Sequence, residues 1–168
     1  MKIRCATIED CKDIAELEKA CFPATEAATE KAFGDRLIHY PNSFWIAEND
    51  GRIVGMVNGM CSDDTVLKDE MFADASMHNN NGAWQMIFGV CTLPEYRKKG
   101  IAGMLLEAAI NDTKNRGKKG LVLTCKEALL PYYSKFGFVN EGVSASEHGG
   151  ALWYQMKLEF GREVSKQQ

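Results

Sequence analysis

Apolar residues recur along this chain with two different periods. Over residues 152–160 an apolar side chain returns at every second position, which is typical of a strand that buries one face. Over residues 11–21 apolar side chains return every three or four positions instead, which is the spacing of a helix with one buried face. Thr7 and Asp10 precede that helix at the spacing of a capping box. The mixture of the two periods indicates the α/β class.

The other elements follow from the same patterns and from turn residues. Further strands are predicted at residues 3–6, 43–48, 52–60, 83–92 and 121–125. Further helices are predicted at residues 26–39, 66–76 (a short one), 101–116 and 127–136. The segment Asn49-Asp50-Gly51 predicts a hairpin turn, and Thr25 is the predicted cap of the helix at 26–39. In the helix at 101–116, the buried face is predicted to carry Ile101, Met104, Leu105 and Ala108.

Length and composition limit the classes of protein that fit. A chain of 168 residues is expected to form one domain, here over residues 1–160 with a loose tail at 161–168. The net charge of −3 argues against general nucleic-acid binding. No apolar run approaches the roughly 18 residues of a membrane span, and the N-terminus carries no apolar signal region, so a cytoplasmic protein without a membrane partner is expected. The six cysteines form no C-x-x-C pair, which predicts free thiols and no metal site.

The most informative segment is the basic turn after the strand at 83–92. Arg97, Lys98 and Lys99 precede Gly100 and Gly103 at the start of a helix. A helix N-terminus offers unpaired N–H groups and a positive dipole end to an anion, and glycines let a bulky anion approach the backbone. The alternative is a solvated charged turn. The spacing matches neither a P-loop nor the dinucleotide fingerprint.

Two motifs resemble a known family. The turn reads R-x-x-G-x-A, which resembles the coenzyme A pyrophosphate loop of the GCN5-related N-acetyltransferases (GNAT). Residues 128–138 resemble the arylalkylamine N-acetyltransferase branch of that superfamily. The resemblance implies a mixed, mostly antiparallel sheet of six to seven strands flanked by about four helices. Two central strands, ending at Thr92 and Cys125, are expected to splay apart and form the cofactor cleft.

The resemblance also implies which residues hold acetyl-CoA. The pantetheine arm is expected along the strand backbone, and the N–H near Val90 is the expected oxyanion donor. The pyrophosphate is expected on the loop and first helical turn, where Arg97 contributes more to loop geometry than to direct contact. The implied cofactor-binding residues are Val90, Cys91, Thr92, Arg97, Lys98, Lys99, Gly100, Ile101, Ala102 and Gly103.

Tyr133 is the catalytic acid that the resemblance implies. It stands four residues before Gly137, where the family places a tyrosine that protonates the departing thiolate. A phenol is neutral at pH 7 and can give up such a proton. The alternative is that Tyr132 and Tyr133 are both core aromatics, and Tyr132 is the better candidate for plain packing.

The proton acceptor departs from the family pattern. Met86 and Phe88 stand where the vertebrate enzymes carry two histidines, so a histidine relay does not transfer. Insect relatives use a glutamate in the region where the second predicted helix starts, and Glu26 is the residue here that matches it. The alternative is that Glu26 is only a carboxylate at a helix N-terminus. His148 falls at no catalytic position of the family and is read as a loop histidine.

These observations predict an acetyl-CoA-dependent N-acetyltransferase that acts on a small primary amine by direct attack in a ternary complex, without a metal. An arylalkylamine is the first candidate substrate, and a monomer or homodimer is expected. A protein or peptide α-amine acetyltransferase is the alternative among enzymes. A non-catalytic acyl-CoA-binding sensor is the alternative from another class.

Overall fold

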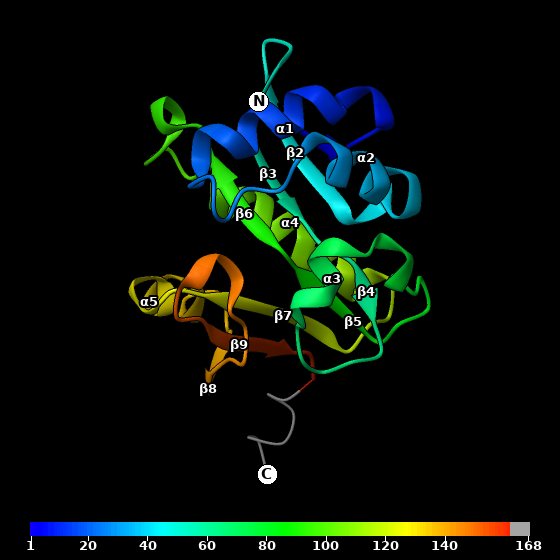
Figure 1. Ribbon diagram of the computed structural model, residues 1–168, viewed down its shortest axis with the longest axis vertical. Helices are drawn as coiled ribbons and strands as arrows, with labels where there is room; N and C mark the ends of the chain where they lie inside the picture. Colours follow the sequence, from blue (N-terminus) through cyan, green and yellow to red (C-terminus); the bar gives the residue numbers. More distant parts are fainter. Residues whose placement is uncertain (162–168) are drawn as a thin grey trace.

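The computed structural model describes residues 1–161, so the predicted tail lies, apart from Gly161, outside the described residues. Within them the chain forms nine strands and five α-helices joined by short 3₁₀ turns (Figure 1). The strands are β1 (Lys2–Cys5), β2 (Phe44–Asn49), β3 (Arg52–Asn58), β4 (Cys61–Ser62), β5 (Trp84–Ile87), β6 (Gly89–Thr92), β7 (Gly120–Cys125), β8 (Val139–Val143) and β9 (Tyr154–Glu159). The helices are α1 (Cys11–Cys21), α2 (Glu30–His39), α3 (Asp69–Ala73), α4 (Ile101–Asn115) and α5 (Leu130–Ser134).

The strands form two sheets that share a continuous stretch of chain. One sheet has the order β1-β2-β3-β6 and is antiparallel throughout. The other has the order β4-β5-β7-β9-β8, in which only β5 and β7 are parallel. The α/β class is therefore confirmed, with more strands than the sequence predicted.

The predicted strand at 83–92 is wrong in one respect, because it is two strands in different sheets. β5 pairs with β7 as far as Ile87 and Leu123, whereas β6 pairs with β3. Phe88 is the residue between them, and its N–H donates to Asn58 O at 2.7 Å. Phe88 belongs to neither strand. It is the point at which the chain passes from one sheet to the other, so β6 and β7 diverge beyond it.

The second helix begins later than predicted. Thr29 caps α2, since its hydroxyl oxygen accepts the N–H of Ala32 at 3.1 Å. Thr25 lies instead in a turn in which the N–H groups of Glu26 and Ala27 both donate to Pro23 O at 2.9 Å. Residues 26–29 are therefore a loop, and the interpretation of Glu26 as a helix-end carboxylate is wrong.

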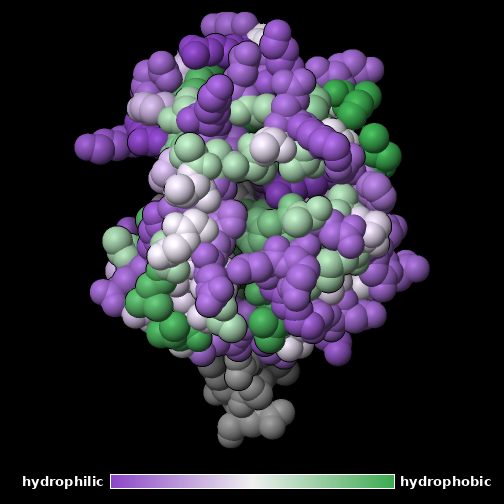
Figure 2. All heavy atoms as spheres, viewed as in Figure 1, coloured by the Kyte–Doolittle hydropathy of each residue, from purple (hydrophilic) through white to green (hydrophobic). Residues whose placement is uncertain are grey.

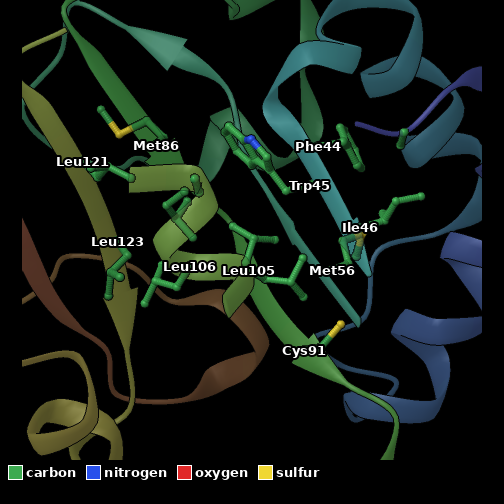
Figure 3. Packing of buried hydrophobic residues seen from close by; sticks show 14 of the residues in the cluster. Phe44, Trp45, Ile46, Met56, Met86, Cys91, Leu105, Leu106, Leu121 and Leu123 are labelled. Carbon is green, nitrogen blue, oxygen red and sulfur yellow. The ribbon is translucent and has the colours of Figure 1, made fainter. Parts of the chain in front are cut away.

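α4 packs on β2, β3 and β6, α1 also packs on β3 and β6, and α2 lies against α1 (Figure 1). The core includes buried residues of all three helices. Ile101 and Leu105 are buried as predicted, but Met104 is exposed and Leu106 takes its place in the core. The buried face of α4 therefore carries Ile101, Leu105, Leu106, Ala109 and Thr113. Figure 3 shows Leu105 and Leu106 beside Met56 of β3 and Leu123 of β7.

Several local predictions are confirmed, and two strands were missed, β4 and β8. Thr7 N–H donates to Asp10 Oδ2 at 2.8 Å, as a capping box requires. Asp50 and Gly51 have φ of 50° and 79°, the left-handed conformation of a tight hairpin. β8 was not predicted because its exposed edge sequence, interrupted by Gly142, has no apolar alternation. No helix of the described chain is long and apolar enough to cross a membrane.

Candidate active site

The divergence of β6 from β7 leaves one edge of β6 without a partner strand. Leu93 N–H donates to Val54 O at 2.8 Å, and residues of an antiparallel pair alternate between facing the partner strand and facing away. Val90 and Thr92, opposite Val57 and Gly55, therefore direct their own N–H and C=O groups away from β3. The N–H and C=O of Val90 and the N–H of Thr92 face a cleft, where an extended ligand can pair with them as an added strand does, whereas Thr92 O already accepts from Arg97 and Cys21.

A cavity of about 360 Å³ lies along this free edge, and we call it the loop-side cavity. It brings together every predicted cofactor-binding residue except Lys99, whose ammonium lies over the ring of Tyr96 at 5.4 Å. The oxygen Oγ1 of Thr92, which lines the cavity, is buried and has no hydrogen-bond partner in the described structure. The predicted cofactor-binding residues therefore share one cavity, with Lys99 as the exception.

The loop before α4 presents backbone N–H groups to the loop-side cavity. Lys98 and Gly100 have φ of 63° and 79°, so the chain turns sharply twice before the helix. The first helical N–H···O bond runs from Met104 to Gly100, which leaves the preceding N–H groups of the first turn unpaired within the helix. Arg97 does not point at these groups, because its Nε–H donates to Thr92 O at 3.1 Å. The loop therefore offers an anion site made mainly of backbone, and Arg97 fixes its shape.

Tyr133 lies where the loop-side cavity meets a second cavity of about 220 Å³, the middle cavity. Its side chain is 7% exposed and packs edge-on against Tyr132 and Phe138. Burial raises the pKa of the Tyr133 phenol above its ordinary value, so the hydroxyl stays protonated at neutral pH. Tyr132 stacks obliquely on Phe136 and lines only the loop-side cavity.

A thiol at the same junction was missed by the sequence analysis. Cys21 lines both cavities, and its Sγ–H donates to Thr92 O at 3.3 Å. A hydrogen bond from the Cys91 thiol, together with nearby Arg97, lowers the pKa of Cys21 to about 7 against the opposing effect of burial. In the sequence, Cys21 is only one member of an apolar helical stripe, so no pattern could distinguish it from a core residue.

The third cavity, of about 340 Å³, opens between α1, α2, α3 and the β8–β9 loop, and we call it the helix-side cavity. It shares residues with the middle cavity, namely Phe22, Glu26, Phe88, Gly89, Thr124 and Trp153. The space-filling view shows the surface hollowed near the middle of this face (Figure 2). The three cavities thus adjoin one another from the loop of α4 to the helix-side face.

Glu26 lies between the helix-side and middle cavities, but its carboxylate is held by a cation. Lys126 Nζ donates to Glu26 Oε2 at 2.8 Å, and the Glu26 side chain is 9% exposed. The ammonium of Lys126 also lies over the ring of Trp153 at 5.6 Å. His148, which the sequence analysis placed outside the site, lines the helix-side cavity, stacks on Phe72 and has its Nε2 3.0 Å from Glu26 O.

Two buried charged residues form the inner wall of the helix-side cavity. Glu18 is 7% exposed, and its Oε2 accepts the N–H of Ala28 at 2.9 Å. Burial raises the pKa of Glu18, although the Ala28 N–H and the charges of Arg36 and His148 oppose the rise. Arg36 is 3% exposed, and its terminal nitrogens donate to Asn58 Oδ1 at 3.1 Å and to the carbonyl of residue 72 at 2.9 Å.

Sequence reasoning missed both of these residues, although a signal for each existed. Glu18 follows Ile14 by four residues and so falls on the apolar face of α1, where a charged side chain has to be buried. Arg36 follows Phe33 by three residues on the buried face of α2.

Met86 and Phe88 differ in position, since Met86 is fully buried in the core and Phe88 lines the helix-side and middle cavities. Among the described residues, no group of three His, Cys, Asp or Glu side chains is placed to hold a metal ion.

Two curated proteins are similar to this chain over most of its length. It is 26% identical over 155 residues to YhcX of Bacillus subtilis (strain 168), described as a probable hydrolase, and the match covers 88% of this chain but 29% of that protein. It is 24% identical over 163 residues to the serotonin N-acetyltransferase of Mesocricetus auratus, covering 93% of this chain and 76% of that protein.

Solved structures show the same fold at low sequence identity. The loading GNATL domain of CurA from Lyngbya majuscula matches with a TM-score of 0.81 and 18% identity, covering 94% of this chain and 96% of that one. The PaiA N-acetyltransferase of Thermoplasma acidophilum, solved in complex with coenzyme A, matches with a TM-score of 0.70 and 16% identity, covering 95% and 98%.

The sequence model of the family described as an acetyltransferase (GNAT) domain matches residues 2–139, most of the chain. The splayed strands, the free edge of β6 and the loop before α4 agree with that match. The protein therefore belongs to the GNAT acetyltransferases, which take their acyl group from acetyl-CoA.

Proposed function

We propose that this protein acetylates the primary amine of a small cationic molecule with an aromatic part, by direct attack on acetyl-CoA in a ternary complex. The observation that carries the proposal is the row of three adjoining cavities. The loop-side cavity fits a polyphosphate and an extended arm, and the helix-side cavity combines carboxylates with aromatic rings. The middle cavity, where Tyr133 and Glu26 both lie, is the place at which donor and acceptor can meet.

On the loop side, groups of the protein bind acetyl-CoA and polarise its thioester. When bound, acetyl-CoA supplies an acetyl group already activated as a thioester. The N–H groups at the start of α4 hold the pyrophosphate, and the free edge of β6 aligns the pantetheine arm. The N–H of Val90 faces the cleft and stabilises the negative charge that develops on the thioester oxygen. Tyr133 gives its phenolic proton to the departing sulfur.

On the helix side, charge and shape favour an arylalkylamine. The carboxylates of Glu18, Glu26 and Asp69 line the cavity, so a cationic ammonium is attracted into it. Aromatic side chains line the same cavity and suit an aromatic substrate, namely Phe22, Phe72, Phe88 and Trp153. The volume of about 340 Å³ is in the range of small-molecule sites. The similarity to a serotonin N-acetyltransferase supports the same substrate class.

The family resemblance offers Glu26 as a candidate proton acceptor, and the contacts of its carboxylate suit it better to positioning the amine. Its position between the helix-side and middle cavities suits it to guide the ammonium inward. The ion pair with Lys126 fixes the carboxylate in that position.

The experiment is coenzyme A release from acetyl-CoA over a panel of acceptors, with each acetylated product identified by mass spectrometry. The panel contains phenethylamine, tryptamine, spermidine and a short peptide with a free N-terminal alanine. We expect turnover with the arylalkylamines and little with the peptide. Turnover with the peptide alone would make the protein a peptide α-amine acetyltransferase, and coenzyme A binding without any turnover would make it a sensor.

A further inference from the structure

We propose that Glu18 is the group that takes the proton from the substrate ammonium, an inference that rests on the proposed function. An alkylammonium resembles a lysine side chain, with a pKa of about 10.4, so it must lose a proton before its nitrogen can attack. Met86 and Phe88 cannot accept a proton, so the acceptor has to be another residue at the cavities.

The first argument is the orientation of the Glu18 carboxylate. The Ala28 N–H fixes Oε2, and Oε1 has no hydrogen-bond partner in the described structure. Oε1 lies 4.0 Å from the point where a side-chain Cβ would stand on Gly89. The free oxygen therefore faces the first residue of β6, next to Val90.

The second argument is the place of Gly89 on the path between the cavities. Gly89 lines both the helix-side and the middle cavity, and Glu18 lines the helix-side cavity beside it. An amine that enters from the helix side and approaches the thioester at Val90 passes the gap between Glu18 and Gly89. The absence of a side chain at Gly89 keeps that gap open.

The third argument is the contrast with Glu26. The carboxylate of Glu26 is already occupied, because Lys126 Nζ donates to its Oε2 at 2.8 Å. Glu18 has no such contact: the terminal nitrogens of Arg36 donate to Asn58 and to the carbonyl of residue 72, and its Nε has no hydrogen-bond partner in the described structure. Burial raises the pKa of Glu18, which makes it the better acceptor.

The charged and titratable groups around Glu18 come from several elements. Arg36 of α2 and His148 of the β8–β9 loop face it and favour its charged form. Cys21 on its own helix and Cys91 on β6 are the thiols close enough to interact with its charge. A pH profile assigned to Glu18 therefore has to be separated from the titration of Cys21.

The proton balance closes with Glu18 and Tyr133 alone. The nitrogen gives up two protons while the C–N bond forms and the C–S bond breaks. The first proton goes to Glu18 and is released to water after turnover. The second replaces the proton that Tyr133 gives to the sulfur, so both side chains end as they began.

The test compares Glu18→Gln with Glu26→Gln, using phenethylamine and aniline as acceptors. Glutamine keeps an oxygen for the Ala28 N–H but cannot take a proton. We expect Glu18→Gln to lower kcat for phenethylamine at pH 7 by roughly 10²-fold, with coenzyme A affinity unchanged by calorimetry. The defect should shrink as pH rises and free amine becomes available. The defect should be small for aniline at every pH, because aniline is already neutral. Aniline meets the same Cys21 thiol, so a defect that came from Cys21 would appear with both acceptors.

Wild-type kcat for phenethylamine in Glu18→Gln, or a rise in KM alone, would overturn the proposal. A pH-dependent defect in Glu26→Gln instead would move the role to Glu26. If the wild type acetylates no amine, the proposed function itself fails and this inference fails with it.

If Glu18→Gln does not fold, Gly89→Ala tests whether the amine passes between Glu18 and Gly89. The added methyl would stand 3.7 Å from Asn58 Nδ2 and 4.0 Å from Glu18 Oε1, which are ordinary contacts, so the fold should survive. We expect a fall in kcat/KM for phenethylamine, by about tenfold, with coenzyme A affinity retained. Unchanged kcat/KM in a folded Gly89→Ala protein would show that the amine does not pass this gap.

Discussion

The loop-side and helix-side cavities differ in how the sequence builds them. The loop-side cavity comes mostly from one stretch, residues 90–103, and its ligand contacts are largely backbone groups held by Gly100 and Arg97. The helix-side cavity is assembled from side chains of α1, α2, α3 and the β8–β9 loop, far apart in sequence. In our proposal the first side binds a cofactor common to the family, and the second selects the acceptor. A short motif can therefore identify the donor, while the acceptor depends on tertiary packing.

The largest expected effect lies at Tyr133, where the two sides meet. Tyr133→Phe keeps the ring and removes the hydroxyl, so kcat should fall by roughly 10²-fold or more. Coenzyme A affinity should not change, because the backbone groups of the loop are untouched. Steady-state kinetics and calorimetry measure the two quantities. Tyr132→Phe is the matched control, and an impaired control beside an active Tyr133→Phe enzyme would exchange the roles of the two tyrosines.

A carboxylate in the first turn of α4 should damage the loop side alone. Ala102→Asp places a negative charge beside the N–H groups that are free within the helix, where it stabilises the helix but repels the pyrophosphate. We expect coenzyme A to bind at least about tenfold more weakly, near 1.4 kcal/mol, without loss of thermal stability. Ala102→Asn has the same shape without the charge and should bind closer to wild type. Equal affinities for Ala102→Asp and wild type would contradict an anion site at this turn.

The rate at which the Cys21 thiol is modified should report whether acetyl-CoA is bound. The Cys91 hydrogen bond and nearby Arg97 lower the pKa of Cys21, whereas burial raises the pKa of Cys5, Cys11 and Cys125, so Cys21 carries the larger share of thiolate at pH 7. Iodoacetamide at pH 7 should modify Cys21 several times faster than those three, and acetyl-CoA should slow the reaction at Cys21 only. Peptide mapping by mass spectrometry measures each rate. Equal rates with and without acetyl-CoA would place the cofactor away from Cys21.

The smallest effect concerns stability on the helix side. Burial raises the pKa of Glu18, so the folded state holds a proton more firmly than the unfolded chain, and this contribution to stability is lost as pH rises through the folded-state pKa. Glutamine does not titrate, so Glu18→Gln should gain stability relative to wild type between pH 5 and pH 8, on the order of a few degrees in Tm. Thermal unfolding at both pH values measures the difference. If the Tm of Glu18→Gln falls further below the wild-type Tm as pH rises, the charged carboxylate stabilises the fold.

The sequence predicted the elements where local patterns decide the structure. The capping box of Thr7 and Asp10 and the Asp50-Gly51 hairpin are local, and both are confirmed. The strand at 83–92 was predicted as one element because its apolar run is continuous. Its division at Phe88 depends on pairing with β3 and β7, which lie elsewhere in the sequence. The start of α2 was misplaced because Thr25 and Thr29 both fit a cap.

The site was predictable on the loop side and only in part on the helix side. The motif at 97–103 led to the residues that line the loop-side cavity, Lys99 excepted. Glu18 and Arg36 were missed because a charged residue on an apolar helical face is unusual only when the face is known to be buried. His148 was misjudged because nothing local shows that its loop stacks on Phe72.

The central claim is that the loop-side and helix-side cavities form one reaction path through the middle cavity. A conjugate of coenzyme A in which an acetyl spacer joins the sulfur to the nitrogen of phenethylamine tests this claim most directly. If both cavities are joined, the conjugate should bind in calorimetry at least about tenfold more tightly than coenzyme A, because the second contact becomes intramolecular. Equal affinity for the conjugate and coenzyme A would contradict a continuous path between the cavities.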